Sequence, residues 1–138
     1  MAKPTEVIIA GKRYPMRFSM AASKAITKRF GGLKDMGETM FSEKENEALD
    51  AVTYVVTLLI EQGCAYKNLF EKDEPVPEDA RVDKDGNYIP ITGEELDIAL
   101  GIGDEMKDIM DKIKETIFGP EERKIEAKEI ETKNTEAT

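Results

Sequence analysis

The chain has 138 residues, of which 40% are hydrophobic and 36% charged, proportions typical of one globular domain with much solvated surface. It has no histidine and one cysteine, which excludes His-based catalysis, His-ligated metal sites and an internal disulfide. The net charge of −9 argues against general nucleic-acid binding, because a phosphate backbone would be repelled. No apolar run approaches the ~20 residues of a membrane-spanning helix, so we expect neither nucleic acid nor membrane as a partner.

The charge is unevenly distributed along the chain. Residues 1–34 hold eight basic residues and one acidic residue, whereas 35–138 hold 12 basic and 28 acidic residues. The basic segment is therefore either a surface for an acidic partner or a means of neutralising the acidic remainder of its own chain.

Residues 5–18 have the pattern of a β-hairpin. The β-branched stretch "EVIIA" precedes Gly11, which we place at the first, positive-φ position of a tight two-residue turn followed by Lys12. Apolar and non-apolar positions then alternate on the return strand, and Pro15 among them favours an edge strand. Because a lone hairpin is marginal in water, we expect it to pack on helices.

Helix signals follow the hairpin. Ser19 is the expected N-cap of a helix over about 20–30, which Gly31-Gly32 ends. The stretch "LKDMGETMF" predicts a helical turn that is broken near Gly37.

The middle of the chain predicts the central helix. Ser42 and Glu45 form an S-x-x-E capping box for a helix over about 43–62, which we expect Gly63 to end, with a short helix over 64–70. The stretch "AVTYVVTLLI" would favour a strand by propensity, but the cap and the length favour a helix. Apolar groups nearly encircle 51–60, so this helix should be the most buried.

The C-terminal half alternates between polar and helical segments. Residues 71–92 form a polar excursion with a small hairpin around Asp85-Gly86. Thr92 and Glu95 give a second capping box for a helix over 93–100, and apolar spacing predicts a last helix over 104–118. We therefore expect an α+β, mainly α-helical fold, with the hairpin packed on a small helical bundle. We expect residues 1–119 to form a single globular domain and residues 120–138 to form a disordered, flexible, acidic tail.

The stretch "DKDGNYIPITGEEL" imitates a calcium-binding EF-hand loop. Four oxygen-bearing residues fall at positions one, three, five and twelve of such a loop: Asp83, Asp85, Asn87 and Glu94. However, Tyr88 stands at the sixth position, where the sharp turn needs glycine, and Pro90 at the eighth. We therefore interpret the stretch as an Asp-Gly turn between two short strands.

No other group of residues predicts chemistry. The paired acids lie in polar loops or first helical turns, where carboxylates are solvated and favour the helix dipole. Cys64 has no histidine to activate it and adjoins apolar residues, so we expect an inert core thiol. We expect no catalytic residue, no metal site, no cofactor and no enzymatic activity.

Six residues are candidates for binding a partner. Methionine and phenylalanine side chains make adaptable binding surfaces, and those flanking the glycine break are the ones we least expect to be wholly buried. Together with basic residues of the first helix, the candidates are Lys24, Lys28, Arg29, Met36, Met40 and Phe41.

The run "VIIAGKRYPMRFSMAASKAITKRFGGLKDM" resembles the N-terminal signature of tail assembly chaperones of long-tailed bacteriophages and prophages of Gram-positive bacteria. The motifs that carry the likeness are Gly11-Lys12, Tyr14-Pro15, Arg17-Phe18 before an Ala-rich helix, and Phe30-Gly31 followed by Leu33. The resemblance extends over 5–118 in the order of elements and is specific over 7–33.

This resemblance implies a non-enzymatic factor of the host bacterial cytoplasm, absent from the mature virion. It would bind the tape measure protein and keep it soluble during tail tube assembly. A longer form made by ribosomal frameshift would add a contact with the tail tube protein, and this chain would be the short form. Lys133-Asn134 can be encoded by a slippery run, so we place the shift there. The alternative is a phage or bacterial protein-binding adaptor or regulator with the same small helical domain.

Overall fold

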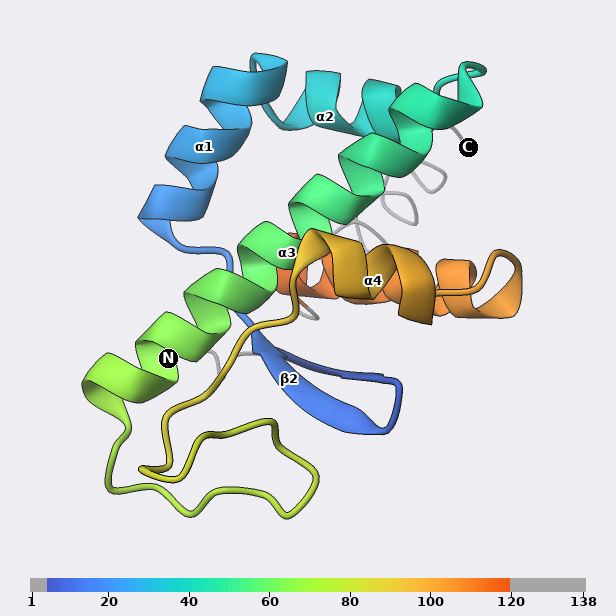
Figure 1. The fold of residues 1–138 in the computed structure, drawn as a ribbon. Helices are drawn as coiled ribbons and strands as arrows, with labels where there is room; N and C mark the ends of the chain where they lie inside the picture. Colours follow the sequence, from blue (N-terminus) through green and yellow to red (C-terminus); the bar gives the residue numbers. More distant parts are fainter. Residues whose placement is uncertain (1–4, 120–138) are drawn as a thin grey trace, which may run out of the picture.

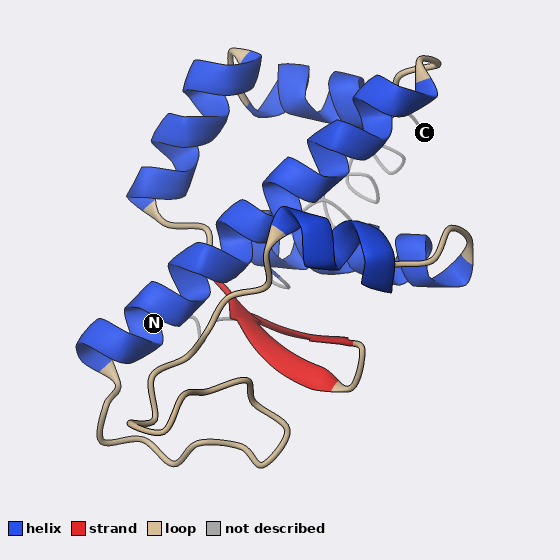
Figure 2. Ribbon diagram, in the orientation of Figure 1, coloured by secondary structure: helices blue, strands red, loops and turns tan. Residues whose placement is uncertain are grey.

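The computed structural model describes residues 5–119, in which a two-stranded hairpin precedes five helices (Figures 1 and 2). The predicted α+β, mainly α-helical fold class is confirmed. The predicted tail over 120–138, including Lys133-Asn134, lies outside the described residues. The elements are β1 (Thr5–Ile9), β2 (Lys12–Met16), α1 (Met20–Phe30), α2 (Leu33–Met40), α3 (Glu45–Phe70), α4 (Gly93–Ala99) and a last helix over 104–119.

The hairpin turns one residue earlier than predicted. β1 and β2 are antiparallel, and Ile9 pairs with Lys12, so the two-residue turn is Ala10-Gly11. Both turn residues have positive φ, 50° for Ala10 and 79° for Gly11, as a type I′ turn requires. Ala10 adopts the positive φ of the first turn position, and Gly11 therefore takes the second position.

α3 runs through the centre of the fold and packs against β2, α1, α2 and α4 (Figure 1). Its side chains that are no more than 1% exposed include Val55, Val56, Leu59 and Ile60, so the prediction of a central buried helix is confirmed. By length and composition α3 is also sufficient to cross a membrane, a property that core helices share. Here its apolar side chains form the core of the fold.

The predicted break of this helix at Gly63 is wrong. α3 is one helix of 26 residues, without separation into 43–62 and 64–70. Gly63 lies where β2 crosses the helix, and a Cβ atom there would stand 2.2 Å from the carbonyl oxygen of Pro15. The glycine is required for this close approach, not for ending the helix.

The helix caps agree with the sequence at two of three places. The side chain of Ser19 accepts from the backbone N–H of Ala22, and Thr92 and Glu95 form the predicted reciprocal capping box. The predicted Ser42 box is wrong, because the N-cap of α3 is Lys44, and its N–H donates to the Ser42 hydroxyl at 3.1 Å. Ser42 therefore stabilises the turn that precedes the helix. The predicted break of α2 at Gly37 is also absent, since α2 is helical through this residue.

Residues 71–92 follow the outer edge of β2. The backbone N–H of Arg13 donates to the carbonyl of Asp79 at 2.8 Å, and Arg13 forms an isolated parallel bridge with Ala80. A second bridge joins Val82 to Tyr88 in antiparallel fashion around the Asp85-Gly86 turn, which confirms the predicted small hairpin. This segment thus covers one edge of the sheet.

Candidate partner-binding surfaces

The basic candidates lie on the solvent side of α1. Lys24, Lys28 and Arg29 are exposed, and neither lysine forms an ion pair with any residue of 5–119. The guanidinium of Arg29 lies 4.2 Å from the ring centre of Tyr54 on α3, a cation–π contact that restrains it. The two lysine side chains are therefore less restrained on this face than that of Arg29.

The expectation that Met36 and Met40 are accessible is wrong. Their side chains are only 5% and 7% exposed and belong to the core. The four-residue spacing puts both on the face of α2 that packs against α3. Phe41, by contrast, is 68% exposed at the end of α2. The six candidates therefore do not form one continuous surface.

A shallow groove lies between α3 and α4, which we call the α3–α4 groove. Its volume is about 270 Å³. The apolar lining residues come from α3, α4 and the segment after α4: Leu49, Val52, Leu96, Leu100, Ile102 and Met106. Asp50 and Asp97 lie at its borders, and the carboxylate of Asp97 accepts from the Thr53 hydroxyl at 2.7 Å. The groove therefore combines apolar side chains with polar ones, two of which are carboxylates.

Two isoleucines close in sequence are exposed, and of these Ile102 lines the α3–α4 groove whereas Ile98 lies outside it. Ile98 on α4 is 82% exposed, and Ile102 in the groove wall is 76% exposed. Burying one such side chain against a partner contributes about 1.5–3 kcal/mol. This part of the surface is suited to an apolar partner.

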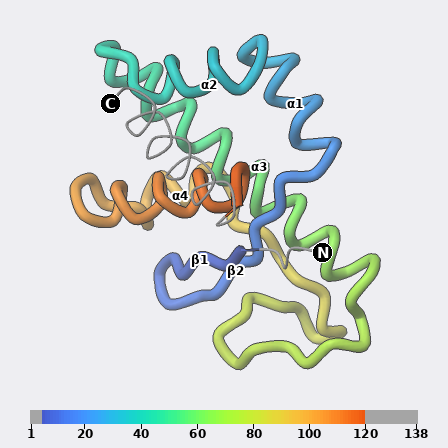
Figure 3. The backbone as a smooth tube through the Cα atoms, turned by 180° about the vertical axis from the view of Figure 1, so that it is seen from behind, coloured from blue at the N-terminus to red at the C-terminus, as the bar shows by residue number. Residues whose placement is uncertain are grey.

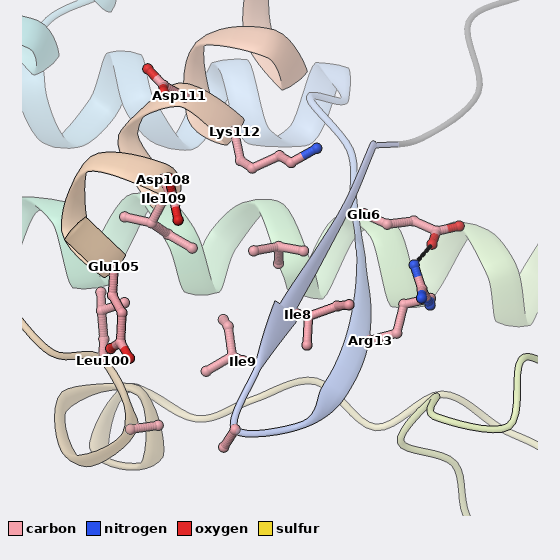
Figure 4. Close-up of a pocket in the computed structure, with 13 residues that line it drawn as sticks. Glu6, Ile8, Ile9, Arg13, Leu100, Glu105, Asp108, Ile109, Asp111 and Lys112 are labelled. Carbon is pink, nitrogen blue, oxygen red and sulfur yellow. Dashed lines mark hydrogen bonds and ion pairs between the residues drawn. The ribbon is translucent and has the colours of Figure 1, made fainter.

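A larger groove lies between β1 and helix 104–119, which we call the β1 groove (Figure 4). Its volume is about 560 Å³. Ile8 and Ile9 approach it from the strand and Ile109 from the helix, and Leu100 lines both this groove and the α3–α4 groove. Seen from behind, the helix and β1 lie side by side in front of α3 (Figure 3).

Charges around the β1 groove are mainly acidic. Glu6, Glu105, Asp108 and Asp111 contribute four carboxylates, and the two cations are Arg13 and Lys112. The Arg13 guanidinium contacts the carboxylates of Glu6 at 2.8 Å and Asp79 at 3.0 Å. These hydrogen bonds, that of Asp79 first, raise the pKa of Arg13 further above its ordinary value. Its charge is therefore already neutralised.

Two carboxylates of the helix wall, those of Asp108 and Asp111, have no cationic partner within residues 5–119. Lys112 lies 3.4 Å from Glu115, and Glu105 accepts from the backbone N–H of Gly101 at 2.6 Å. Asp108 and Asp111 are exposed and form no ion pair within residues 5–119. The groove consequently presents uncompensated negative charge.

The stretch that imitated an EF-hand has a local role. One carboxylate oxygen of Asp83 accepts from the backbone N–H groups of Asp85 and Asn87, both at 2.9 Å. The hydrogen bond from Asn87 is the main reason that the pKa of Asp83 is lowered. Asp83 thus holds the predicted Asp85-Gly86 turn through its side chain. Within residues 5–119, no cluster groups three or more potential metal ligands.

Cys64 is buried, as predicted. Its side chain is 2% exposed, and burial raises the pKa of the thiol to about 12. The thiolate, which is the nucleophilic form, is therefore scarce at neutral pH.

Comparison with known proteins finds no relative of this chain. It matches no protein-family model, no curated protein and no solved structure. The fold, the two grooves and the resemblance of residues 7–33 are therefore the observations on which a function can be argued.

Neither groove is evident from the sequence. The apolar positions that line them have the pattern of ordinary core or loop residues, because their exposure depends on which elements pack together. One signal was available for the α3–α4 groove: the Gly-Ile-Gly stretch places Ile102 in a segment where no helical face can bury it.

Proposed function

We propose that the protein is a non-enzymatic tail assembly chaperone that binds the tape measure protein in the host bacterial cytoplasm and leaves before the virion matures. The resemblance over residues 7–33 supports this proposal, and the α3–α4 groove gives it a binding surface. A shallow apolar groove with polar borders accepts one face of an amphipathic helix. Long helical proteins such as tape measures expose faces of this kind until the tube encloses them.

The exposure of Ile98 and Ile102 is the single observation that carries the proposal. Large apolar side chains in contact with water, one of them in the wall of a groove, indicate a protein-interaction surface. Binding there would cover them and shield equivalent side chains of the partner. No bond-breaking chemistry enters this activity, which needs only reversible burial of apolar surface.

Co-expression with the tape measure protein of the same gene cluster tests the proposal. We expect the tape measure protein to remain soluble and to co-purify with the wild-type chain. The double variant Ile98→Asp/Ile102→Asp should abolish both effects, since a carboxylate in the contact carries an uncompensated desolvation cost. Leu69→Asp is the matched control, because Leu69 is 72% exposed at the far end of α3.

The outcomes separate the candidate functions. A wild-type chain that neither solubilises nor retains the tape measure protein overturns the chaperone proposal. Retention of a different protein through the same isoleucines would instead support the adaptor or regulator. In the gene, codons at 132–134 that cannot slip, with no overlapping downstream frame, would remove the frameshifted long form and its contact with the tail tube protein.

A further inference from the structure

The outer edge of β1 carries backbone groups that the hairpin does not use. Residues Ile9 and Lys12 flank the two-residue turn and form the hydrogen-bonded pair that closes it. Because hydrogen-bonded and non-hydrogen-bonded pairs alternate, the pairs Val7–Tyr14 and Thr5–Met16 are bonded as well. The N–H and C=O groups of Glu6 and Ile8 therefore point away from β2.

The opposite edge of the hairpin verifies this assignment. Arg13 is paired with Ile8, and its N–H indeed points away from β1, donating to Asp79. Pro15, paired with Glu6, has no N–H to donate. Loop 71–92 thus covers the β2 edge, whereas no residue of 5–119 donates to or accepts from the backbone of Glu6 or Ile8 on the β1 edge.

This edge faces the β1 groove. At one end, the hydroxyls of Thr5 and Thr116 are in contact and join the strand to helix 104–119. Beyond that contact the groove extends to Ala10 and Leu100, near the hairpin turn. Ile8, 56% exposed, lines it together with Ile9 and Ile109 (Figure 4). A strand edge beside a helix wall that is mainly acidic can accept the backbone of an added strand and the basic side chains on one face of it.

We propose that the β1 groove receives an extended segment of a partner protein with alternating apolar and basic side chains, which adds to β1 as a third strand. The backbone of this segment pairs with Glu6 and Ile8. Its apolar side chains contact Ile8, the exposed isoleucine of the groove, and its basic side chains approach Asp108 and Asp111. This inference is independent of the α3–α4 groove and of the proposed chaperone function.

The negative charge of the β1 groove favours a basic segment of a partner over a second copy of the chain. Two copies joined through β1 would bring two sets of the same unpaired carboxylates together, and each chain already carries a net charge of −9. Like charges brought together disfavour association, whereas a basic segment is attracted. The same repulsion disfavours an acidic segment.

Binding of a short synthetic peptide of alternating lysine and valine tests the proposal. We expect saturable binding by fluorescence anisotropy that weakens as salt is added, and none for a glutamate–valine peptide. Two versions methylated on alternate amides test the backbone pairing. The version whose methyl groups face β1 should bind about tenfold more weakly, because two edge hydrogen bonds are lost.

A charge-reversal variant locates the site. Asp108→Lys/Asp111→Lys should weaken peptide binding about tenfold. The control Glu38→Lys/Glu61→Lys makes the same charge change at exposed positions of α2 and α3, outside both grooves, and should leave binding nearly unchanged. Circular dichroism establishes that both variants fold.

Amide hydrogen exchange gives the most direct measurement. The amides of Glu6 and Ile8 should exchange rapidly in the free protein and slowly with peptide bound. Those of Val7 and Ile9, which pair with β2, should be slow in both states and serve as internal controls.

Three results would each overturn the proposal. The first is equal binding of the peptide and both methylated versions, and the second is unchanged binding by Asp108→Lys/Asp111→Lys. The third is protection of Glu6 and Ile8 without peptide that increases with protein concentration, which would identify a second copy as the occupant.

Discussion

Replacing Gly63 by alanine should destabilise the fold substantially, although alanine is the better helix former. The new Cβ atom would lie 2.2 Å from the carbonyl oxygen of Pro15, 2.4 Å from its carbonyl carbon and 2.8 Å from the backbone nitrogen of Met16. All three are backbone atoms, which cannot rotate away as a side chain would. To restore a contact of roughly 3.5 Å, β2 must move away from α3 by about 1 Å.

The cost of that movement can be worked from the contacts it disturbs. Overpacking of this kind costs about 2 kcal/mol. Weakening the hydrogen bond from the Arg17 N–H to the Leu59 carbonyl, now 2.9 Å long, costs about 1 kcal/mol. Partial exposure of Met16, which is fully buried, costs about 1 kcal/mol more. Alanine returns about 1 kcal/mol of helix propensity, so the expected net loss is about 3 kcal/mol.

Urea and thermal unfolding followed by circular dichroism measure this loss. We expect a melting temperature about 10 °C lower than that of the wild type. Gly37→Ala is the matched control, since Gly37 lies inside α2 and a Cβ there meets nothing within 4 Å. That variant should gain about 0.5–1 kcal/mol. If Gly63→Ala were neutral or stabilising like the control, the close approach of β2 to α3 would be refuted.

Three further predictions follow from individual side chains. Ser19→Ala removes the hydroxyl that accepts from the Ala22 N–H at 3.0 Å and should lower the free energy of unfolding by about 1 kcal/mol in urea titrations; no change would show that the cap is dispensable. The hydrogen bond from Arg81 lowers the pKa of Glu95 from 4.5 to about 2, so its stabilising effect is complete above pH 4.5 and is lost as the pH falls toward 2. Urea midpoints over this window should therefore fall more steeply for the wild type than for Glu95→Gln, which keeps the capping geometry; parallel curves would contradict the assignment. A thiol reagent at pH 8 should label Cys64 at least about 100-fold more slowly in the native than in the urea-unfolded chain, and equal absorbance traces would mean that the thiol is accessible.

The sequence by itself determined where several helices begin and end. The Ser19 cap, the Thr92–Glu95 box and the left-handed Gly31 that ends α1 each depend on residues within a few positions of one another. The central helix was also predictable despite its β-branched residues, because its length favours a helix and its encircling apolar side chains favour burial, although the Ser42 cap on which the prediction also relied is wrong. The fold class followed from the order of these elements.

Only the tertiary structure decided the meaning of residues whose neighbours are distant in sequence. Gly63 looks like a helix end in the sequence, but it allows a strand 47 residues earlier, at Met16, to cross the helix at close range. Met36 and Met40 look adaptable and accessible, but the packing of α2 against α3 buries them in the core. Glycine and methionine are permissive residues, so their local pattern constrains their environment weakly.

The two grooves are likewise features that only the tertiary structure decided. The β-branched run and the alternation on the return strand predict a hairpin with one buried face, but which edge of β1 remains unpaired depends on where loop 71–92 and helix 104–119 pack. Exposure of an edge is a property of the assembled neighbours, whereas hydrogen-bonding capacity is a property of every residue. The sequence therefore specified the strand, and the packing of distant segments decided that β1 faces a groove.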